Sequence, residues 1–308
     1  MEKLAKMDAV SIAIASIGRP SLADTLRSLA KVTTSQAAAV SVVVADDSPD
    51  GAATRLVESL DLDGLPVTCL AVASGNISTA RNALLDAVAG DWIVFVDDDE
   101  WVEPDWLERL FVCQREYAAD VVIGPVHPAY PDDAPEWLVR ANLLHHDWGH
   151  RGKRLMTGRG GNTLARMDLI RGLGLRFDPA LGVTGGEDTA FFAQAASNGA
   201  VIVVCDDAMA HEHVPPERLK PSYILRRAVR SGQSYAIARR ADNPGFAWRG
   251  LFALDAAAKC AAAAFLALVF MPFDRAAHFR MRHKLALNYG KLRAVFGLPL
   301  AELYRRAD

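Results

Sequence analysis

Cysteine is scarce in this chain of 308 residues, which contains only Cys69, Cys113, Cys205 and Cys260. The four lie far apart, and none belongs to a CxxC pair or has the Cys/His spacing of a zinc module. Disulfide-stapled secreted domains and zinc modules both need closely spaced cysteines. The sequence therefore excludes both classes and fits a reducing cytosol.

Long hydrophobic runs are also rare. The first 20 residues hold too short an apolar run for a signal peptide, and no cleavage site follows it, so we expect no export. Residues 251–271 approach the ~20 residues that span a bilayer, but Asp255 and Lys259 interrupt them. The uninterrupted part, residues 260–273, has 14 residues. A single span, a helix lying on the membrane and a packed core helix all stay open.

A large net charge of one sign is missing too, since 34 Lys and Arg oppose 37 Asp and Glu. The net charge of −3 hides an asymmetry. Residues 215–308 carry 17 basic and 6 acidic side chains, which leaves a balance of −14 for residues 1–214. An acidic part suits metal and sugar chemistry, whereas a basic part suits phosphates or an anionic surface. We therefore expect a catalytic domain at 1–214 and a basic helical region at 215–308 that associates with an anionic membrane and not with nucleic acid.

Short β-branched runs alternate with helical patterns through the first half of the chain. Strands are expected at 10–15, 40–45, 67–72, 92–96 and 121–123, with helices at 21–30, 78–89 and 106–117. This order predicts an α/β fold with a mainly parallel central sheet and ligands at the carboxyl ends of its strands. From residue 218 onward the pattern is helical, with breaks at 243–245, 272 and 297–299.

Acidic residues follow two of the expected strands. Residues 97–100 (Asp-Asp-Asp-Glu) come directly after strand 92–96, and Asp46 and Asp47 end strand 40–45. Crowded carboxylates suit Mg²⁺ or Mn²⁺ bound together with nucleotide phosphates, although a solvated acidic turn has the same composition. Carboxylates at 46–47 suit ribose or base contacts, whereas a turn and helix cap is the plainer interpretation.

Two further motifs open helices. Arg81 lies in the first turn of the helix at 78–89 and suits a nucleotide contact, although a surface arginine looks the same in sequence. Residues 185–188 (Gly-Gly-Glu-Asp) precede the helical run 189–197. Their carboxylates suit either helix capping or the work of a general base beside a sugar.

Taken in order, these motifs resemble glycosyltransferase family 2, nucleotide-sugar enzymes with the GT-A fold. The resemblance rests on Asp46-Asp47, Ala80-Arg81-Asn82, Asp97-Asp98-Asp99, Gly160-Gly161-Asn162 and Gly186-Glu187-Asp188. Residues 156–188, with His213 and the arginines that follow, are most similar to bacterial exopolysaccharide enzymes of the succinoglycan type.

The resemblance implies a role for each matching position. It makes Asp188 the catalytic base, with Glu187 orienting hydroxyl groups, and places Asp46, Arg81, Asp97 and Asp98 at the nucleotide. Asn162, Gly161 and Gly186 would lie near the donor or acceptor sugar. The Mg²⁺ or Mn²⁺ ligands would be Asp99 and Asp97, with His213, and the neighbouring His211, in a region where some relatives bind metal or diphosphate.

The implied reaction is an inverting transfer from a nucleoside-diphosphate sugar, UDP-linked, to a hydroxyl of a glycan on a polyprenyl diphosphate, at the inner face of the cell membrane. The QxxRW sequence of processive synthases does not occur, which favours addition of a single residue. A sugar-phosphate nucleotidyltransferase and a non-catalytic scaffold of a polysaccharide assembly complex are the alternatives. Residues 15–20 lack the Gly-rich loop and lysine of the former, and the acidic motifs disfavour the latter.

Overall fold

A computed structural model of the chain describes residues 8–35, 37–145, 148–242 and 245–301. Residues 1–7 of the amino-terminal segment used to judge export, and residues 243–244 of the expected break at 243–245, lie outside these residues. By its contacts the chain divides into two compact units. The first comprises Met1–Pro128, His146–Val183 and Glu187–His213, and the second comprises Ala129–His145, Thr184–Gly186 and Val214–Asp308.

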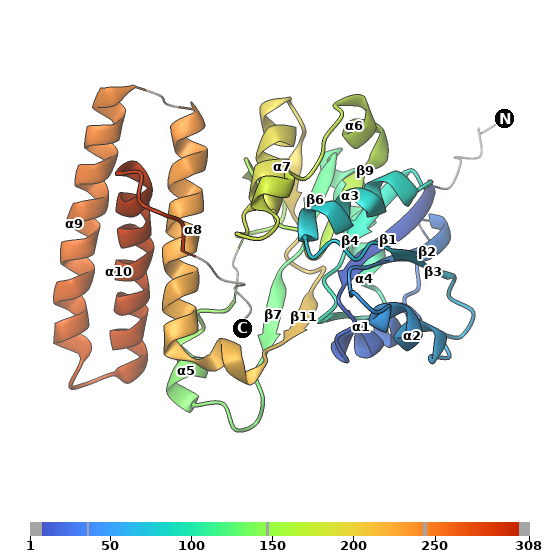
Figure 1. Cartoon of the computed structure of the whole chain (residues 1–308), viewed down its shortest axis with the longest axis horizontal. Coiled ribbons are helices and arrows are strands. Elements are labelled where there is room, and N and C mark those ends of the chain that lie inside the picture. Colours follow the sequence, from blue (N-terminus) through green and yellow to red (C-terminus); the bar gives the residue numbers. More distant parts are fainter. Residues whose placement is uncertain (1–7, 36, 146–147, 243–244, 302–308) are drawn as a thin grey trace. The chain divides into compact units, whose positions relative to one another are not determined.

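The first unit is built on an eight-stranded sheet with the order β3-β2-β1-β4-β9-β6-β10-β8 (Figure 1). Its strands are β1 (Asp8–Ser16), β2 (Ala37–Asp46), β3 (Val67–Ala71), β4 (Trp92–Phe95), β6 (Val121–Ile123), β8 (Arg154–Leu155), β9 (Thr163–Arg166) and β10 (Ile202–Val204). The first four pair in parallel, whereas β9 runs antiparallel between β4 and β6. The predicted α/β fold with a mainly parallel sheet is confirmed.

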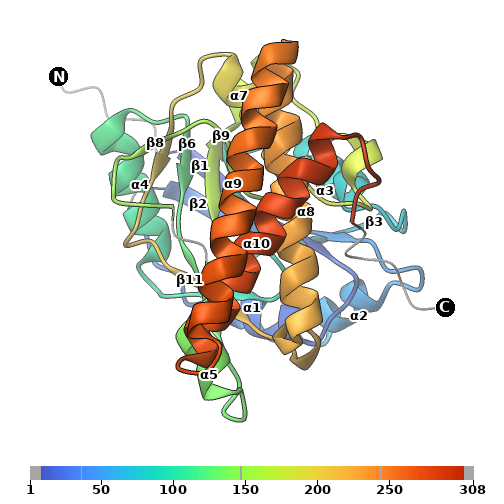
Figure 2. The same ribbon diagram turned by 90° about the vertical axis from the view of Figure 1, so that its left-hand side faces the viewer.

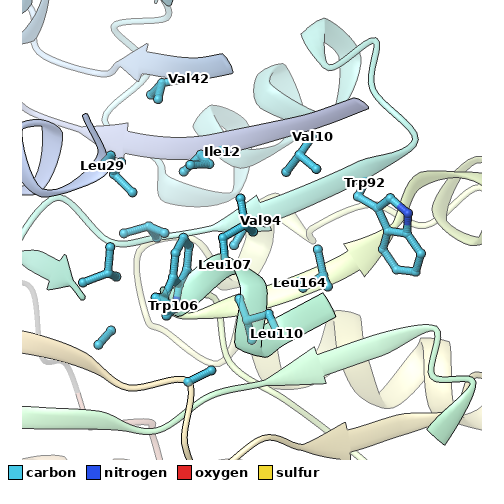
Figure 3. Packing of buried hydrophobic residues seen from close by; sticks show 14 of the residues in the cluster. Val10, Ile12, Leu29, Val42, Trp92, Val94, Trp106, Leu107, Leu110 and Leu164 are labelled. Carbon is cyan, nitrogen blue, oxygen red and sulfur yellow. The ribbon is translucent and has the colours of Figure 1, made fainter. Parts of the chain in front are cut away.

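Helices cover both faces of this sheet, because alternate side chains of a strand point to opposite faces and both sets here are apolar. One face packs against α1 (Ser21–Leu29), α2 (Ala52–Glu58) and α4 (Trp106–Tyr117). Figure 3 shows part of this core, where Val94 of β4 and Leu164 of β9 lie among Trp106, Leu107 and Leu110 of α4. The other face packs against α3 (Ile77–Ala87), α6 (Met167–Gly172) and α7 (Glu187–Ser197).

A smaller sheet of β5 (Glu100–Val102), β11 (Ala210–His213) and β7 (Val126–Ala129) begins at the acidic turn. β5 pairs antiparallel with β11, so that Trp101 faces His211 across the ladder. Neither β5 nor α2 was predicted, because both are short and both directly follow turn residues. The loop-rich stretch expected at 127–160 contains β7, α5 (Glu136–Ala141) and β8.

The second unit contains three long helices, α8 (Pro221–Asp242), α9 (Phe246–Phe270) and α10 (Arg275–Val295), together with α5. The long helices run side by side in both views (Figures 1 and 2). Glycine permits a very close approach of α8 and α10, since a Cβ added at Gly290 would lie 2.0 Å from the Val229 carbonyl oxygen. Asp274 begins α10 by accepting hydrogen bonds from the backbone N–H groups of Ala276 and Ala277.

α9 exposes most of its apolar side chains. Phe265 and Leu268 are 67% and 68% exposed, and among the described residues α9 alone is long and apolar enough to cross a membrane. Only 17% of its most apolar stretch is buried. Asp255 and Lys259, which interrupt the apolar sequence, pair with each other at 2.6 Å.

Candidate active site

The carboxyl ends of β1, β2 and β4 meet at one edge of the large sheet. The register pairs Ser16 of β1 with Asp46 of β2, and Ala13 of β1 with Phe95 of β4. The loops that follow the three strands therefore lie next to one another, as the parallel arrangement predicted. Ligands of α/β proteins bind at this edge.

Buried arginines neutralise the acidic turn at residues 97–100. Arg81 Nη2 lies 3.2 Å from Asp97 Oδ1, and Arg159 Nη2 lies 3.2 Å from Glu100 Oε1 and 3.6 Å from Asp97 Oδ2. Burial alone would lower the pKa of each arginine, but the neighbouring carboxylates outweigh it and raise the pKa of both. The first unit thus holds a compact network of opposite charges beneath the turn.

Burial also shifts the pKa of two carboxyl groups of the turn. Burial raises the pKa of Glu100 to about 8, with Asp97 adding to the effect and Arg159 opposing it. Burial likewise raises the pKa of Asp98 to about 6, against the opposing effects of Arg19 and Ser16. A cation beside these groups would favour their charged forms.

Arg19, in the loop after β1, supplies one such cation. Its Nη1 lies 3.2 Å from Asp98 Oδ1 and 3.3 Å from Asp99 Oδ2, so one nitrogen contacts both carboxylates. Ser16 Oγ donates to the other oxygen of Asp98 at 2.6 Å. The position between Asp98 and Asp99 is therefore one that accepts positive charge.

The acidic turn could also take part in holding a divalent ion. Among the residues that the structure describes, no group of three or more His, Cys, Asp or Glu side chains could hold a metal by itself. Mg²⁺, however, is commonly held by one or two carboxylates together with substrate phosphates. Two carboxylates of the acidic turn could supply such ligands.

The Glu187-Asp188 pair is joined to the acidic turn through Arg81. Arg81 Nη1 donates to Glu187 Oε1 at 2.7 Å, while its other terminal nitrogen contacts Asp97. Asp188 is half-buried, and its Oδ2 accepts a hydrogen bond from the backbone N–H of Gly160 at 3.2 Å. Burial raises the pKa of Glu187, with Asp188 adding to the effect and Arg81 opposing it. Two motifs far apart in sequence therefore share one charge network.

Gly160 and Gly161 allow the chain to pass close to this network. A Cβ at Gly160 would lie 2.3 Å from Arg81 Nη2, and one at Gly161 would lie 2.3 Å from Glu100 Oε1. Contact with the buried charges therefore explains both glycines, whereas a sugar contact of Gly161 stays a prediction. Gly186 has a φ of +94°, a conformation that L side chains rarely adopt.

Both carboxylate oxygens of Asp46 form hydrogen bonds with residues that follow β2. Its two carboxylate oxygens accept hydrogen bonds from the backbone and hydroxyl groups of Ser48 and Thr54. Burial would raise the pKa of Asp46, but these hydrogen bonds outweigh it and lower the pKa. Asp47 binds the next loop, where its Oδ1 accepts from the backbone N–H groups of Ser74 and Gly75. The pair thus shapes the loops at this edge of the sheet, which is the turn interpretation of the motif.

The Arg81 side chain is buried against an aromatic ring. Its side chain is only 8% exposed and lies over the Phe177 ring, with 5.5 Å between the guanidinium carbon and the ring centroid. A nucleotide contact of Arg81 stays a prediction.

The side chain of Asn162 is buried and connects several segments of the first unit. Its Oδ1 accepts from the Trp106 indole N–H at 2.7 Å, and its Nδ2 donates to the carbonyls of Pro125 and Ala208 at 2.8 Å each. The residue is 0% exposed. This corrects the predicted sugar contact, since the amide group is buried and forms its hydrogen bonds inside the fold.

The histidines of β11 face away from the acidic turn. The His213 backbone N–H donates to the Asp99 carbonyl oxygen, but its ring packs on Trp101 at 4.3 Å between centroids. Trp101 and Glu100 are consecutive in β5 and so point to opposite faces. His211 stacks on the same indole. The predicted metal role of His213, and of His211, does not fit this arrangement.

Sequence reasoning missed the arginines that complete the site. Arg159 directly precedes the Gly160-Gly161 pair, and Arg19 follows the first strand, so both occur beside motifs that were noticed. A search for basic residues at the same sheet edge as the carboxylates could have found Arg19. Nothing in the sequence indicates that Arg159 pairs with Glu100.

Comparison with known proteins agrees with this geometry. Residues 11–174 match the sequence profile described as Glycosyl transferase family 2. Over 302 residues the chain is 37% identical to the succinoglycan biosynthesis protein ExoM of Rhizobium meliloti (strain 1021), covering 96% of this chain and 95% of that protein. It is 34% identical over 83 residues to the glycosyltransferase GlyA of Streptococcus pneumoniae serotype 4, which covers 27% of this chain and 12% of that protein.

Solved structures of TarS from S. aureus share the fold. The TarS fragment 1–349 matches with a TM-score of 0.54 at 18% identity, covering 94% of this chain and 91% of that one. A longer TarS chain matches with a TM-score of 0.53 at 19% identity, and there this chain covers 54% of the TarS chain. The family match, the full-length relative and the shared GT-A fold lead to one conclusion: the chain belongs to glycosyltransferase family 2.

Proposed function

We propose that the chain transfers a sugar, with inversion, from a UDP-sugar to a hydroxyl of a lipid-linked glycan during exopolysaccharide synthesis. The observation that carries this proposal is the network in which Arg81 joins Asp97 of the acidic turn to Glu187, next to Asp188. It joins the acidic turn to the Glu187-Asp188 pair. The relative named for succinoglycan biosynthesis supports the process, and TarS structures containing UDP and UDP-GlcNAc support the donor.

Asp188 is the proposed base. Its carboxylate would take the proton of the acceptor hydroxyl as the oxygen attacks the anomeric carbon from the face opposite the nucleotide. The bond to the donor phosphate oxygen breaks in the same displacement, so the configuration inverts and UDP leaves. Gly160 holds one oxygen of Asp188 and Thr189 the other, which fixes the direction of the carboxylate.

Asp99 and Asp97 are the proposed ligands of Mg²⁺ or Mn²⁺, with Asp98 beside them at the nucleotide. When bound, a divalent ion supplies charge neutralisation for the departing diphosphate. Asp46 and Asp47 contribute by shaping the loops that would border the base and ribose. Glu187, held by Arg81, would orient the acceptor or donor hydroxyls.

We further propose that residues 1–214 are the catalytic domain and that residues 215–308 attach the enzyme to the inner face of the cell membrane. The exposed apolar side chains of α9 and the +11 balance of this region support attachment. A polyprenyl-diphosphate acceptor would be found at that surface.

Nucleotide binding measured with and without Mn²⁺ tests the proposal. Wild-type protein should show a thermal shift with UDP that grows when Mn²⁺ is added, whereas a non-catalytic scaffold should show none. Asp99→Asn should lose the Mn²⁺-dependent part and keep its melting temperature without ligand. Asp168→Asn, at an exposed position in α6, is the matched control and should behave as wild type. A UDP shift equally dependent on Mn²⁺ in Asp99→Asn would contradict the metal assignment.

A further inference from the structure

The loop after β1 places an arginine on the carboxylates proposed to meet the metal and the nucleotide. Arg19 Nη1 contacts Asp98 Oδ1 at 3.2 Å and Asp99 Oδ2 at 3.3 Å. The two carboxylate side chains are 7% and 10% exposed, whereas the arginine side chain is 44% exposed. The carboxylates are therefore fixed, and the cation between them can leave toward solvent.

The loop that carries Arg19 is itself held in place. The Gly18 backbone N–H donates to Ser16 Oγ at 3.0 Å, and that hydroxyl donates to Asp98 Oδ2. Gly18 has a φ of +81°, and a Cβ there would lie 2.5 Å from the Ala52 Cβ. The backbone of the loop is thus tied to the acidic turn, and movement of Arg19 is confined to its side chain.

We propose that Arg19 is an exchangeable counter-ion: it neutralises Asp98 and Asp99 in the nucleotide-free enzyme, yields to the divalent ion, and then binds the diphosphate of the donor. This inference rests on the proposed function. A guanidinium released from these carboxylates stays on the loop beside them. Phosphate oxygens are its natural new partners, because arginine binds phosphate and carboxylate with the same fork of donors.

The proposal predicts effects of opposite sign on two ligands. Arg19→Gln should bind Mn²⁺ more tightly in the absence of nucleotide, since the competing positive charge is gone. The same variant should bind Mn²⁺-UDP more weakly, on the order of tenfold, which is the loss expected for one hydrogen bond between charged groups. If the arginine only supported the loop, its removal would weaken the binding of both ligands or of neither.

Mn²⁺ binding followed by electron paramagnetic resonance, and UDP binding followed by calorimetry at saturating Mn²⁺, measure the two effects on the full chain. Arg27→Gln is the matched control, because Arg27 is an exposed arginine of α1 that pairs with Asp24, and it should change neither affinity. Arg19→Lys keeps the charge and should retain most of the UDP affinity.

Tighter Mn²⁺ and weaker UDP binding in Arg19→Gln would support the exchange. The proposal would be overturned if Arg19→Gln bound Mn²⁺ as tightly as wild type or less tightly. It would also be overturned if Arg19→Lys bound UDP as weakly as Arg19→Gln does. Wild-type protein that binds neither Mn²⁺ nor UDP would instead refute the proposed function, so the two failures are distinguishable.

Discussion

Arg81 connects two separate motifs of the proposed site. It bridges Asp97 and Glu187, the second of which is 106 residues away in sequence, and it contacts Phe177 through its planar face. A buried ion pair is weak evidence for stability, but removing one partner leaves an uncompensated charge in a poorly solvated place. Arg81 is therefore structural for the site whether or not it meets a nucleotide.

Arg81→Gln should lower the free energy of unfolding by about 3–5 kcal/mol, the usual effect of breaking a buried charge pair. Urea denaturation measures the change. Arg55→Gln, at a side chain 61% exposed and paired with the exposed Asp50, should cost less than about 1 kcal/mol. Equal effects of the two substitutions would show that the Arg81 network is solvated and contributes no more than a surface pair.

At this scale the sequence allowed the acidic residues to be found, but not their partners. Asp97, Asp99 and Asp188 stand next to recognisable turns and helix starts, so motif spacing indicates them. Asn162 belongs to an equally recognisable motif, yet its amide is buried against Trp106. Side-chain direction within a turn depends on tertiary packing, which spacing does not encode.

Among the elements, the contact of α8 with α10 depends most plainly on particular residues. A Cβ at Gly232 would lie 1.9 Å from the Leu287 carbonyl oxygen, and one at Gly290 would lie 2.0 Å from that of Val229. Both obstacles are backbone atoms, which cannot turn aside as a side chain can. The two helices therefore pack at this distance only with glycine at both positions.

Gly290→Ala should destabilise the chain by at least about 1–3 kcal/mol, the usual cost of overpacking. Gly250→Ala is the control, because Gly250 lies within α9 with no atom near its missing Cβ and should gain roughly 0.5–1 kcal/mol from helix propensity. Thermal unfolding of both variants tests the contact, and stabilisation by alanine at 290 would contradict it.

His283 of α10 gives this region a pH dependence. Burial lowers the pKa of His283, and the positive charge of Arg227 on α8 lowers it further. The unfolded chain binds a proton near the ordinary pKa of about 6.5, and the folded chain binds it only at lower pH. The stabilisation is present above about pH 6.5 and is lost as the pH falls below it.

Chemical denaturation between pH 8 and pH 5 should therefore show a steeper loss of stability for wild-type protein than for His283→Gln. Parallel curves for wild type and His283→Gln would mean that the folded and unfolded chains hold this proton equally well.

Elements with a clear apolar or helical pattern were predictable, including the short strand β6 at 121–123, whereas β9 was not. The helix expected at 106–117 coincides with α4, and the strand expected at 10–15 lies inside β1. The sequence 163–166 gave no signal for β9, although that strand lies antiparallel in the middle of the sheet. Four residues are too few to show a period, so pairing with neighbours decides their conformation.

For the molecule as a whole, the exposed apolar side chains of α9 call for an explanation, because soluble proteins rarely leave such a patch uncovered. The charge asymmetry visible in the sequence already favoured an anionic surface for residues 215–308. The sequence left open whether α9 is a core helix. The low burial of its apolar stretch in the structure disfavours that interpretation.

Full-length protein should float with anionic liposomes, and salt should weaken the binding. Phe265→Glu combined with Leu268→Glu should reduce the floated fraction without lowering the melting temperature, since both side chains are exposed. Val112→Glu, at an exposed position of α4, should float as wild type does. A double variant that still floats fully would rule out α9 as the attachment surface.

We propose Asp188 as the base of the sugar transfer. The turnover per bound donor of the Asp188→Asn variant is the most direct measurement of this role. UDP-, GDP- and dTDP-sugars are first screened for hydrolysis by wild-type protein with Mn²⁺, and the variant is then compared on the active donor. We expect the turnover of the variant to fall by a factor of about 10²–10⁴, the usual contribution of a general base, while its UDP affinity stays unchanged. Normal turnover, or weaker UDP binding with turnover per bound donor unchanged, would contradict it.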